Sequence, residues 1–541
     1  MVSMATFKNE STFKNYSESG REGEFDRLFD EAVSEVKQKH MGKRHPLYIN
    51  GDEEYAPEEI TEYSPIDGSY IGKFQKATRE QTDMAIMAAS EAFKSWSQID
   101  YKERVRIFRK AAELFSKYKF RVAAILSIEN GKTRYESIGE VDEAIDFLNY
   151  YSLELEKNKG YVRRTKLDES KVHVKAAFQG APGKAERVTI ALKPYGVFGV
   201  IAPFNFPISI SVGMSTGALI TGNTVVFKPS STDNMTMLTG LEIYNIFSEA
   251  GLPKGVFNYI TGPGSEVGDE LVMSKYVSGI VFTGSKSTGL SMISKTLQAG
   301  MQKAFIVEMG GKNPVIVSKN ADLEAAASGI VSAAYGYCGQ KCSAASRVYV
   351  HEAVKEELIS KILDHMHSLK IGDPLKKENY VGPLISASAL KRYNQSVEEI
   401  KKTGRIIYGG KVVSTQNGIY VEPVLAEADH SNPLFHKELF LPFLLVDTYK
   451  KLEEAIAKAN DTEYGLTAGM YSMKKSEIRE YSKAIQAGVV YINRETSATT
   501  GAIVGLHTFV GWKGSGLTGK GTGSRFYLQQ FMREQSLSIV G

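Results

Sequence analysis

The 541-residue sequence predicts an α/β fold with two Rossmann-like domains built on parallel sheets. Three observations lead to this prediction. Apolar segments without polar alternation, such as PYGVFGVIAP and NTVVFKPS, suit strands that are buried on both faces. These segments alternate with helix-like segments, the order that places helices on both faces of a parallel sheet. The cycle restarts after residue 303, which indicates a second domain.

The segments before this cycle are mainly helical. Residues 1–45 carry many acidic and basic side chains and suit a helical N-terminal arm. Residues 47–55 contain an Asn-Gly pair between short apolar stretches, which is a hairpin signal. From residue 78 to about residue 157, apolar residues recur at spacings of three and four, which predicts several amphipathic helices.

These patterns set the expected domain boundaries. We expect the first α/β domain to combine residues 46–158 and 191–307, and the second to span 308–504. Residues 159–190 are basic, β-like and interrupted by glycine and proline, so they suit either a protruding hairpin or a linker. The tail at 505–541 is Gly-rich and then apolar, as expected of an arm that packs elsewhere.

Composition argues against several classes of protein. The net charge of +4 is too small for a dedicated nucleic-acid binder. Two cysteines, Cys338 and Cys342, argue against a disulfide scaffold and suit a reducing compartment. No HExxH or Cys/His cluster is present, and we interpret the pair His365 and His367 as solvated or capping residues, so we expect no metal. The polar N-terminus and the lack of a long apolar run predict a cytoplasmic protein without a membrane partner.

Cys342, in GQKCSAASR, is the first candidate for chemistry. It lies in a polar turn after an Ala/Gly-rich helix, whereas Cys338 has the apolar neighbours of a structural thiol. A nucleophilic cysteine requires access and a lowered pKa. Lys341 is adjacent, but the backbone amides of the turn could lower that pKa more. The alternative interpretation of Cys342 is a small core residue.

Glu308 and Asn205 each follow an apolar strand. Glu308, in EMGGKNP, precedes a Gly-Gly pair at the carboxyl end of a strand, where α/β enzymes place catalytic groups. An exposed loop glutamate is the alternative. Asn205, in APFNFP, lies in a loop made rigid by two prolines, and a fixed amide suits an oxyanion hole. A local Asx turn is the alternative.

Two glycine clusters, GPGSEVG and FTGSKSTG, also follow strands. Ser285 is the expected N-cap of a helix whose N-terminus would favour a phosphate. Neither cluster is a GxGxxG fingerprint in its usual place, and ordinary helix caps explain both equally well.

In their order along the chain, these segments resemble the aldehyde dehydrogenase superfamily. PFNFP, KPS, FTGS, EMGGKNP, GQKC, KELF and FVGWKGSG follow one another as in the superfamily, between about residues 45 and 520. Glu308 and Cys342 are 342 − 308 = 34 residues apart, as in the superfamily. The resemblance implies that Cys342 is the nucleophile, that Asn205 and the Cys342 N–H hold the oxyanion, and that Glu308 activates the water that hydrolyses a thioester.

The resemblance also implies how the domains are used. The first domain would bind NAD or NADP and the second would carry the nucleophile. Residues 159–190 and 505–541 would form an oligomerisation arm, in a homodimer or an assembly of dimers.

The motifs shared with the superfamily also imply which residues bind the cofactor. Lys228 would meet the adenosine ribose, Ser285 the pyrophosphate and Glu438 the nicotinamide ribose. Ser231 stands where NAD-selective members place a glutamate, so we expect NAD to be preferred and NADP to be tolerated. Leu441 replaces the glycine that most members have after the phenylalanine of this motif. The full predicted cofactor set is Ile201, Ala202, Pro203, Phe204, Lys228, Ser230, Ser231, Gly264, Gly268, Phe282, Thr283, Gly284, Ser285, Met309, Gly310, Glu438 and Phe440.

Three segments resemble the subfamily that oxidises glutamate γ-semialdehyde, the open form of 1-pyrroline-5-carboxylate. They are GQKCSAASR, TTGAIVG and the N-terminal part with EVDEAIDFLNYY. The Ser343 hydroxyl and the amides of Gly501 and Ala502 would hold the substrate carboxylate, since backbone amides bind anions well. Glu143 is a candidate partner for the substrate ammonium, with a solvated helix face as the alternative. Two phenylalanines, Phe206 and Phe509, would wall the aliphatic chain.

Two other functions stay open. Another semialdehyde dehydrogenase, acting on succinate or ketoglutarate semialdehyde, often uses an arginine for the distal carboxylate. A non-catalytic scaffold would be expected to lack Cys342, Glu308 or Asn205, and all three are present. Coupling to a proline dehydrogenase is compatible with activity.

Overall fold

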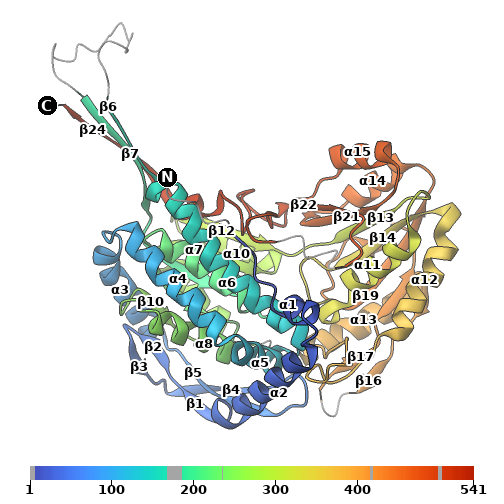
Figure 1. Ribbon diagram of the computed structural model, residues 1–541, viewed down its shortest axis with the longest axis horizontal. Coiled ribbons are helices and arrows are strands. Elements are labelled where there is room, and N and C mark those ends of the chain that lie inside the picture. The colour runs from blue at the N-terminus through green and yellow to red at the C-terminus, as the bar shows by residue number, and fades with distance from the viewer. Residues whose placement is uncertain (1–6, 167–185, 234, 415–417, 497–502, 541) are drawn as a thin grey trace, which may run out of the picture.

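The computed structural model describes residues 7–166, 186–233, 235–414, 418–496 and 503–540. The protein has two lobes, each built around a seven-stranded sheet, and an arm of three strands that projects from the first lobe (Figure 1). The expected pair of α/β domains is therefore present.

The first sheet has the order β12-β11-β8-β9-β10-β2-β3. Five neighbouring strands are parallel, as predicted, whereas β2 pairs antiparallel with both β10 and the edge strand β3. The edge strands form the expected hairpin, and its turn at Asn50 and Gly51 is left-handed, as an Asn-Gly turn allows. The strands are β12 (Ala304–Met309), β11 (Val277–Gly284), β8 (Val197–Ile201), β9 (Thr224–Lys228), β10 (Phe257–Tyr259), β2 (Leu47–Ile49) and β3 (Asp52–Glu54).

Helices cover both faces of this sheet. One face packs against α3 (Arg79–Trp96), α9 (Asp269–Met273) and α10 (Lys286–Gln298). On the other face, α7 (Ser209–Ile220) and α8 (Met237–Glu249) contact the strands. Behind them lie α4 (Tyr101–Lys117), α5 (Lys119–Asn130) and α6 (Arg134–Lys157).

The second sheet has the order β15-β18-β19-β14-β13-β21-β22, and only the edge strand β15 is antiparallel. Its strands are β15 (Arg405–Tyr408), β18 (Val424–Glu427), β19 (Phe443–Tyr449), β14 (Ala345–His351), β13 (Asn313–Val317), β21 (Thr467–Tyr471) and β22 (Val489–Ile492). One face packs against α11 (Leu323–Tyr335) and α12 (Lys355–Ser368). The other packs against α13 (Ala387–Thr403), α14 (Leu452–Asn460) and α15 (Lys475–Ala484).

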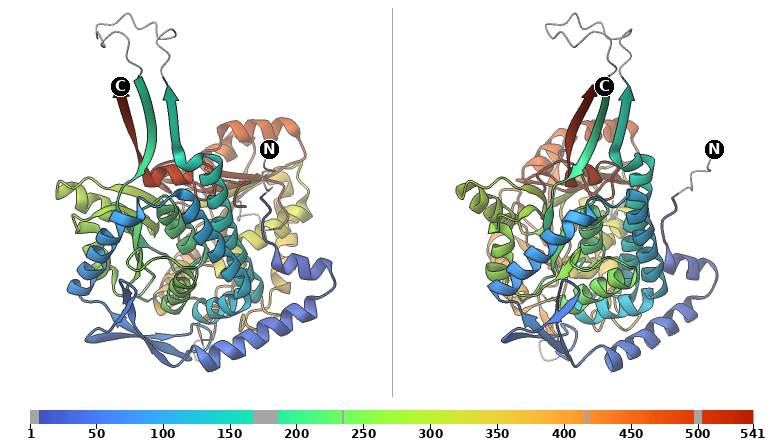
Figure 2. Two further views of the ribbon diagram at one scale, coloured as in Figure 1. Left: turned by 60° about the vertical axis from the view of Figure 1, so that its left-hand side comes forward. Right: turned by 90° about the vertical axis from the view of Figure 1, so that its left-hand side faces the viewer.

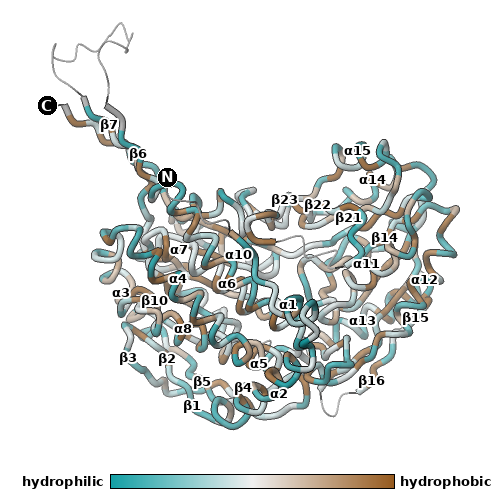
Figure 3. Tube along the Cα trace, viewed as in Figure 1, coloured by the Kyte–Doolittle hydropathy of each residue, from teal (hydrophilic) through white to brown (hydrophobic). Residues whose placement is uncertain are grey.

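The projecting arm joins two distant segments of the chain. The strands β6 (Val162–Lys166), β7 (Glu186–Pro194) and β24 (Met532–Val540) form an antiparallel sheet that stands away from both lobes (Figure 2). The hairpin interpretation of this region is thus confirmed and the linker interpretation is wrong. Polar and apolar residues are interspersed along the arm (Figure 3), and Leu537 and Ile539 are exposed.

One sheet in the N-terminal region was not predicted from the sequence. Strands β1 (Lys43–His45), β5 (Tyr70–Lys76) and β4 (Glu58–Tyr63) form a separate three-stranded sheet. Before it, α1 (Thr12–Glu18) and α2 (Glu22–Lys39) are helical, as expected, but they pack on the first lobe. Two short pairs, β16 (Val412–Ser414) with β17 (Tyr420–Val421) and β20 (Tyr464–Gly465) with β23 (Trp512–Lys513), complete the fold.

None of the helices in the described ranges is long and apolar enough to cross a membrane.

Candidate active site

The carboxyl ends of four neighbouring strands bring the predicted motifs together. In register, Ile201 of β8 pairs with Lys228 of β9 on one side and with Phe282 of β11 on the other. Thr283 pairs in turn with Glu308 of β12. Motifs from residues 201 to 309 therefore share one edge of the first sheet, where parallel α/β sheets bind ligands.

The loop that carries Cys342, here called the nucleophile loop, follows α11 of the second lobe and contains an unusual turn. Tyr337, Cys338 and Gly339, which follow α11, are all left-handed, with φ of 49°, 53° and 66°. A left-handed conformation costs a residue with a side chain about 1 kcal/mol. The Tyr337 hydroxyl donates to Asn130 O at 3.0 Å, and this bond to the first lobe holds the turn.

The turn places Cys342 opposite Glu308. Cys342 Sγ lies 3.7 Å from Glu308 Oε1, a distance compatible with a thiol-to-carboxylate hydrogen bond. Burial raises the pKa of the Cys342 thiol well above its usual range, and the charges of Glu308 and Glu438 raise it further. The adjacent lysine, Lys341, pairs its ammonium with Glu136 at 3.1 Å. The Ser343 backbone N–H does lower the pKa of the thiol, as a turn amide should, but burial dominates.

The other thiol is a core residue. Cys338 is fully buried in the hydrophobic core of the second lobe, and burial raises its pKa. Both cysteines are free thiols. The structural interpretation of Cys338 is therefore confirmed.

Two carboxyl groups in the site, those of Glu308 and Glu143, have raised pKa values. Glu308 is half-buried within β12, and burial raises its pKa to about 8, with a further contribution from the charge of Glu143. Burial raises the pKa of Glu143, on α6, to about 7, although the Ser209 side chain hydrogen-bonds it. The alternative interpretations, an exposed loop for Glu308 and a solvated helix face for Glu143, are both wrong.

Asn205 is held against the nucleophile loop. Its side chain is buried, and Nδ2 donates to Gln340 O at 3.2 Å, two residues before Cys342. This bond joins residues that are 135 positions apart, so the local Asx interpretation is wrong. Gln340 is itself fixed, since its Oε1 accepts from Ile385 N at 2.9 Å.

Lys228 has the environment of a ligand-binding cation. It is buried at the end of β9, and burial lowers its pKa to about 8. Its Nζ donates to Pro229 O at 3.1 Å, and the Ser231 hydroxyl donates to the same carbonyl at 3.0 Å. The two side chains thus converge beside the half-buried Ser230.

The remaining predicted cofactor residues line the same edge or face it. Ser285 is the expected N-cap of α10, where its hydroxyl accepts from Thr288 N at 3.2 Å. Glu438 Oε1 accepts from Gly311 N at 2.7 Å. The left-handed Phe440, with φ of 59°, lies with its ring centroid 5.7 Å from that of Phe204. The other members by position are Ala202 and Pro203 after β8, Gly284 on β11, Met309 and Gly310 at the end of β12, and Gly264 and Gly268 after β10.

The structure shows why Leu441 can replace the glycine that is usual at this position. Its side chain is buried in the core of the second lobe together with Leu439 and Phe443. It therefore points away from the cofactor edge.

The substrate candidates are only partly brought together. Phe509 and Glu308 line one narrow cavity between β11, β12 and the C-terminal segment. Ser343 is buried, and its carbonyl accepts from Thr467 Oγ1 at 3.3 Å. Gly501 and Ala502 lie outside the described residues.

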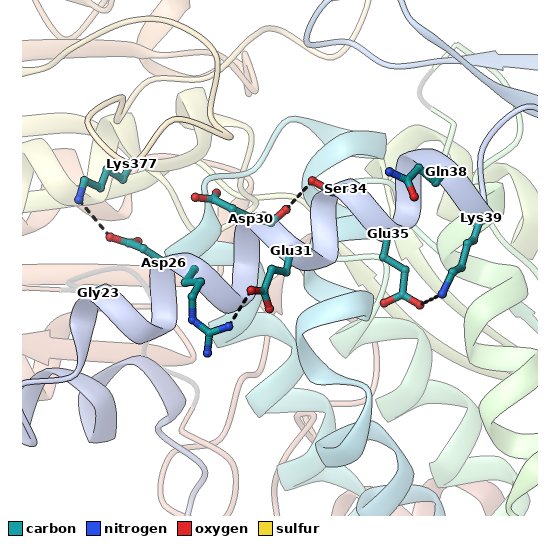
Figure 4. A pocket seen from close by; sticks show the side chains of 10 residues that line it. Gly23, Asp26, Asp30, Glu31, Ser34, Glu35, Gln38, Lys39 and Lys377 are labelled. Atoms are coloured by element: carbon teal, nitrogen blue, oxygen red, sulfur yellow. Dashed lines mark hydrogen bonds and ion pairs between the residues drawn. The ribbon is translucent and has the colours of Figure 1, made fainter.

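Two other features of the described ranges lie outside this site. A hollow on the outer face of α2 is lined by charged side chains that pair with one another, such as Lys377 with Asp26 at 3.2 Å (Figure 4). His430, His436 and Asp461 have ligand atoms within 4.8 Å of one another, a metal-compatible group that their sequence spacing did not reveal. Hydrogen bonds within the protein already engage the ring nitrogens of both histidines.

Lys132 and Glu140, which form a buried ion pair, were not among the residues predicted from the sequence. A signal was present in the spacing of Glu136, Glu140 and Glu143 along α6. Intervals of four and three place these acids on one face of a helix.

Comparison with known proteins decides the family. Residues 52–537 match the model of the aldehyde dehydrogenase family. The chain belongs to the aldehyde dehydrogenase family. This aldehyde dehydrogenase is 36% identical over 521 residues to 1-pyrroline-5-carboxylate dehydrogenase 1 of Halalkalibacterium halodurans, covering 95% of this chain and 96% of that protein. A relative of the same name from a Geobacillus species is 35% identical over 518 residues, covering 95% of this chain and 96% of that protein.

Solved structures agree with this assignment. The aldehyde dehydrogenase superimposes on a Thermus 1-pyrroline-5-carboxylate dehydrogenase with bound NAD, with a TM-score of 0.89 and 33% identity over 99% of this chain and 100% of that chain. It matches proline utilization A of Bdellovibrio bacteriovorus with a TM-score of 0.89 and 32% identity, covering 99% of this chain and 53% of that longer one.

The pair Glu308 and Glu143 leads to a pH prediction. Glu308 can act as a base only after it loses its proton, so the steady-state rate should rise with pH through about 8. Glu143→Gln removes a neighbouring negative charge that raises the pKa of Glu308, so the rising limb should move to lower pH. The measurement is kcat against pH for both proteins.

The matched control is Asp142→Asn, which changes a buried acid on the same helix that contacts Thr12 instead. Its profile should coincide with that of the unmodified enzyme. A Glu143→Gln profile that stays in place would show that the two carboxyl groups do not interact.

Proposed function

We propose that this enzyme oxidises L-glutamate γ-semialdehyde to L-glutamate with NAD⁺, the step that completes proline degradation. The observation that carries the proposal is the 3.7 Å approach of Cys342 Sγ to Glu308 Oε1. It occurs in a chain 36% identical over 521 residues to a 1-pyrroline-5-carboxylate dehydrogenase.

The side chains account for the chemistry. Cys342 gives up its thiol proton to solvent, and the thiolate attacks the aldehyde carbon. The Asn205 amide and the Cys342 backbone N–H donate to the oxyanion that forms. Bound NAD⁺ supplies the hydride acceptor, and the carbon becomes a thioester on Cys342. Glu308 then removes a proton from water, which attacks the thioester and releases glutamate and the thiol.

The cofactor edge fits a dinucleotide. Lys228 is a buried cation whose one hydrogen bond within the described part of the chain goes to a neighbouring carbonyl, so it can donate to ribose hydroxyls. Ser285 leaves the N-terminus of the thirteen-residue α10 exposed toward a phosphate. Ser231 neither repels nor pairs with a 2′-phosphate, which supports NAD with tolerance of NADP.

The substrate's charged groups need separate anchors. Ser343, adjacent to the nucleophile, and the amides of Gly501 and Ala502 would hold the α-carboxylate. Glu143, near Glu308, would accept the α-ammonium. Phe206 and Phe509 would enclose the methylene chain. Succinate semialdehyde lacks the ammonium, so it should leave Glu143 without a partner.

A panel of aldehydes tests the substrate. We predict that kcat/KM for glutamate γ-semialdehyde exceeds that for succinate semialdehyde and for a simple aliphatic aldehyde by at least about tenfold, or roughly 1.4 kcal/mol. The assay is the initial rate of NADH formation at matched concentrations. A higher value for either competitor would refute the glutamate semialdehyde assignment while leaving the aldehyde dehydrogenase chemistry intact.

We further propose that the enzyme works as a homodimer or an assembly of dimers. The arm exposes Ile190, Leu537 and Ile539, with exposed fractions of 38%, 51% and 49%. Among the described residues, it also has two edges without a neighbouring strand, on β6 and β24, which in a lone subunit would favour pairing with another strand. A second copy of the chain would cover both features. The two free thiols suit the cytoplasm, where a proline dehydrogenase would supply the substrate.

The arm yields a prediction on assembly. The unmodified enzyme should elute as a dimer or larger, and Leu537→Lys should shift it toward the monomer because it places a charge in an apolar contact. Light scattering after size-exclusion chromatography measures the mass. Leu297→Lys, at a 67% exposed leucine on α10, is the control and should leave the mass unchanged. A monomeric unmodified enzyme would overturn this proposal.

A further inference from the structure

A buried ion pair joins the two loops that carry the catalytic side chains. Lys132 Nζ contacts Glu140 Oε2, and both side chains are fully buried. Lys132 follows the end of α5, and Glu140 lies on the second turn of α6. Neither residue belongs to the motifs that identify the nucleophile, the base or the oxyanion amide.

Glu140 holds the segment that follows Asn205. Its Oε1 accepts from Ile208 N at 2.7 Å and from Ser209 N at 3.2 Å, at the start of α7. A carboxylate there is stabilised by the unpaired amides and the dipole of the helix. Ile208 is three residues beyond Asn205. Glu140 therefore fixes the point at which the loop that contains Asn205, here called the oxyanion loop, passes into α7.

Lys132 touches both loops with one ammonium group. Its Nζ lies 3.5 Å from the ring centroid of Phe206, next to Asn205, and 4.9 Å from the ring centroid of Tyr337 in the nucleophile loop. A desolvated cation over an aromatic face is attracted by the ring. The same pair thus connects the oxyanion loop, the nucleophile loop and α6.

Stability alone does not explain the pair. Desolvation of two charges costs several kcal/mol per ion, and apolar residues of similar volume often stabilise a protein as well or better. An ion pair does fix directions, because each carboxylate oxygen here has its own partners. Catalysis is sensitive to such placement, since a shift of about 1 Å can reduce a rate by about 100-fold.

We propose that Lys132 and Glu140 are positioning residues that hold Asn205 and Phe206 in register with Cys342. This inference rests on the proposed roles of Cys342 and Asn205, but not on which aldehyde is the substrate. Loss of the pair should slow the first chemical turnover and leave NAD binding intact.

The test is a stopped-flow measurement of the first turnover of NADH in Glu140→Gln. That variant keeps an oxygen acceptor for the α7 amides but loses the charge facing Lys132. We expect the rate of the first turnover and kcat to fall by at least about tenfold, with KM for NAD within about twofold of the unmodified enzyme. The double variant Lys132→Met/Glu140→Gln, which leaves no unpaired buried charge, should show the same loss and carries the test if the single variant does not fold.

Asp142→Asn is the matched control on the same helix. Its carboxylate is also buried and also accepts from a backbone amide, Thr12 N at 2.6 Å, but it faces the N-terminal segment. We expect a lower midpoint of thermal unfolding with a first turnover within about twofold of normal. If Asp142→Asn and Glu140→Gln lose turnover equally, Lys132 and Glu140 have only a structural role. A normal first turnover in Glu140→Gln would overturn the inference.

Cys342→Ala separates this inference from the proposed function. It should show no turnover with any aldehyde. If it retains turnover, Cys342 is not the nucleophile, and the positioning role of Lys132 and Glu140 is wrong as well. If it is inactive while Glu140→Gln is fully active, only the positioning role is wrong.

Discussion

The structure depends on the left-handed turn that carries the nucleophile from the second lobe to the edge of the first sheet. Tyr337, Cys338 and Gly339 reverse the chain after α11, so that Cys342 meets Glu308 across the interface of the lobes. Such a turn persists only where the surroundings over-determine it. Here a tyrosine hydroxyl, a buried glutamine and the Asn205 amide hold it from both lobes.

Burial controls the protonation of the site. It raises the pKa values of Glu308, Glu143 and Glu438, and that of the Cys342 thiol. The nearest lysine in sequence, Lys341, forms an ion pair with Glu136. A carboxyl group beside Cys342 with a pKa of about 8 suits the removal of a proton from the water that hydrolyses the thioester.

Much of the fold and the site was predictable, because the signals are local. Apolar strands and Gly-rich ends place Ile201, Lys228, Thr283 and Glu308 on adjacent strands, so their convergence follows from the rule for parallel sheets. The β1-β5-β4 sheet escaped prediction because β1 has only three residues and β4, EEITEY, is mostly charged, so neither gives an apolar strand signal. The edge hairpin was predicted from its Asn-Gly pair, and a two-residue turn makes its strands antiparallel. The spacing of acids along α6 pointed to Glu140, but its contacts with the α7 amides and those of Lys132 with distant rings could not be read from the sequence.

The central claim is that Cys342 carries the acyl group and Glu308 is needed to remove it. The most direct measurement is mass spectrometry of the Cys342 peptide from Glu308→Gln, after mixing with glutamate γ-semialdehyde and NAD⁺ and quenching in acid. We predict a glutamyl thioester on Cys342 that accumulates in this variant and stays scarce in the unmodified enzyme. An unmodified Cys342 peptide, or an adduct on another residue, would contradict the account.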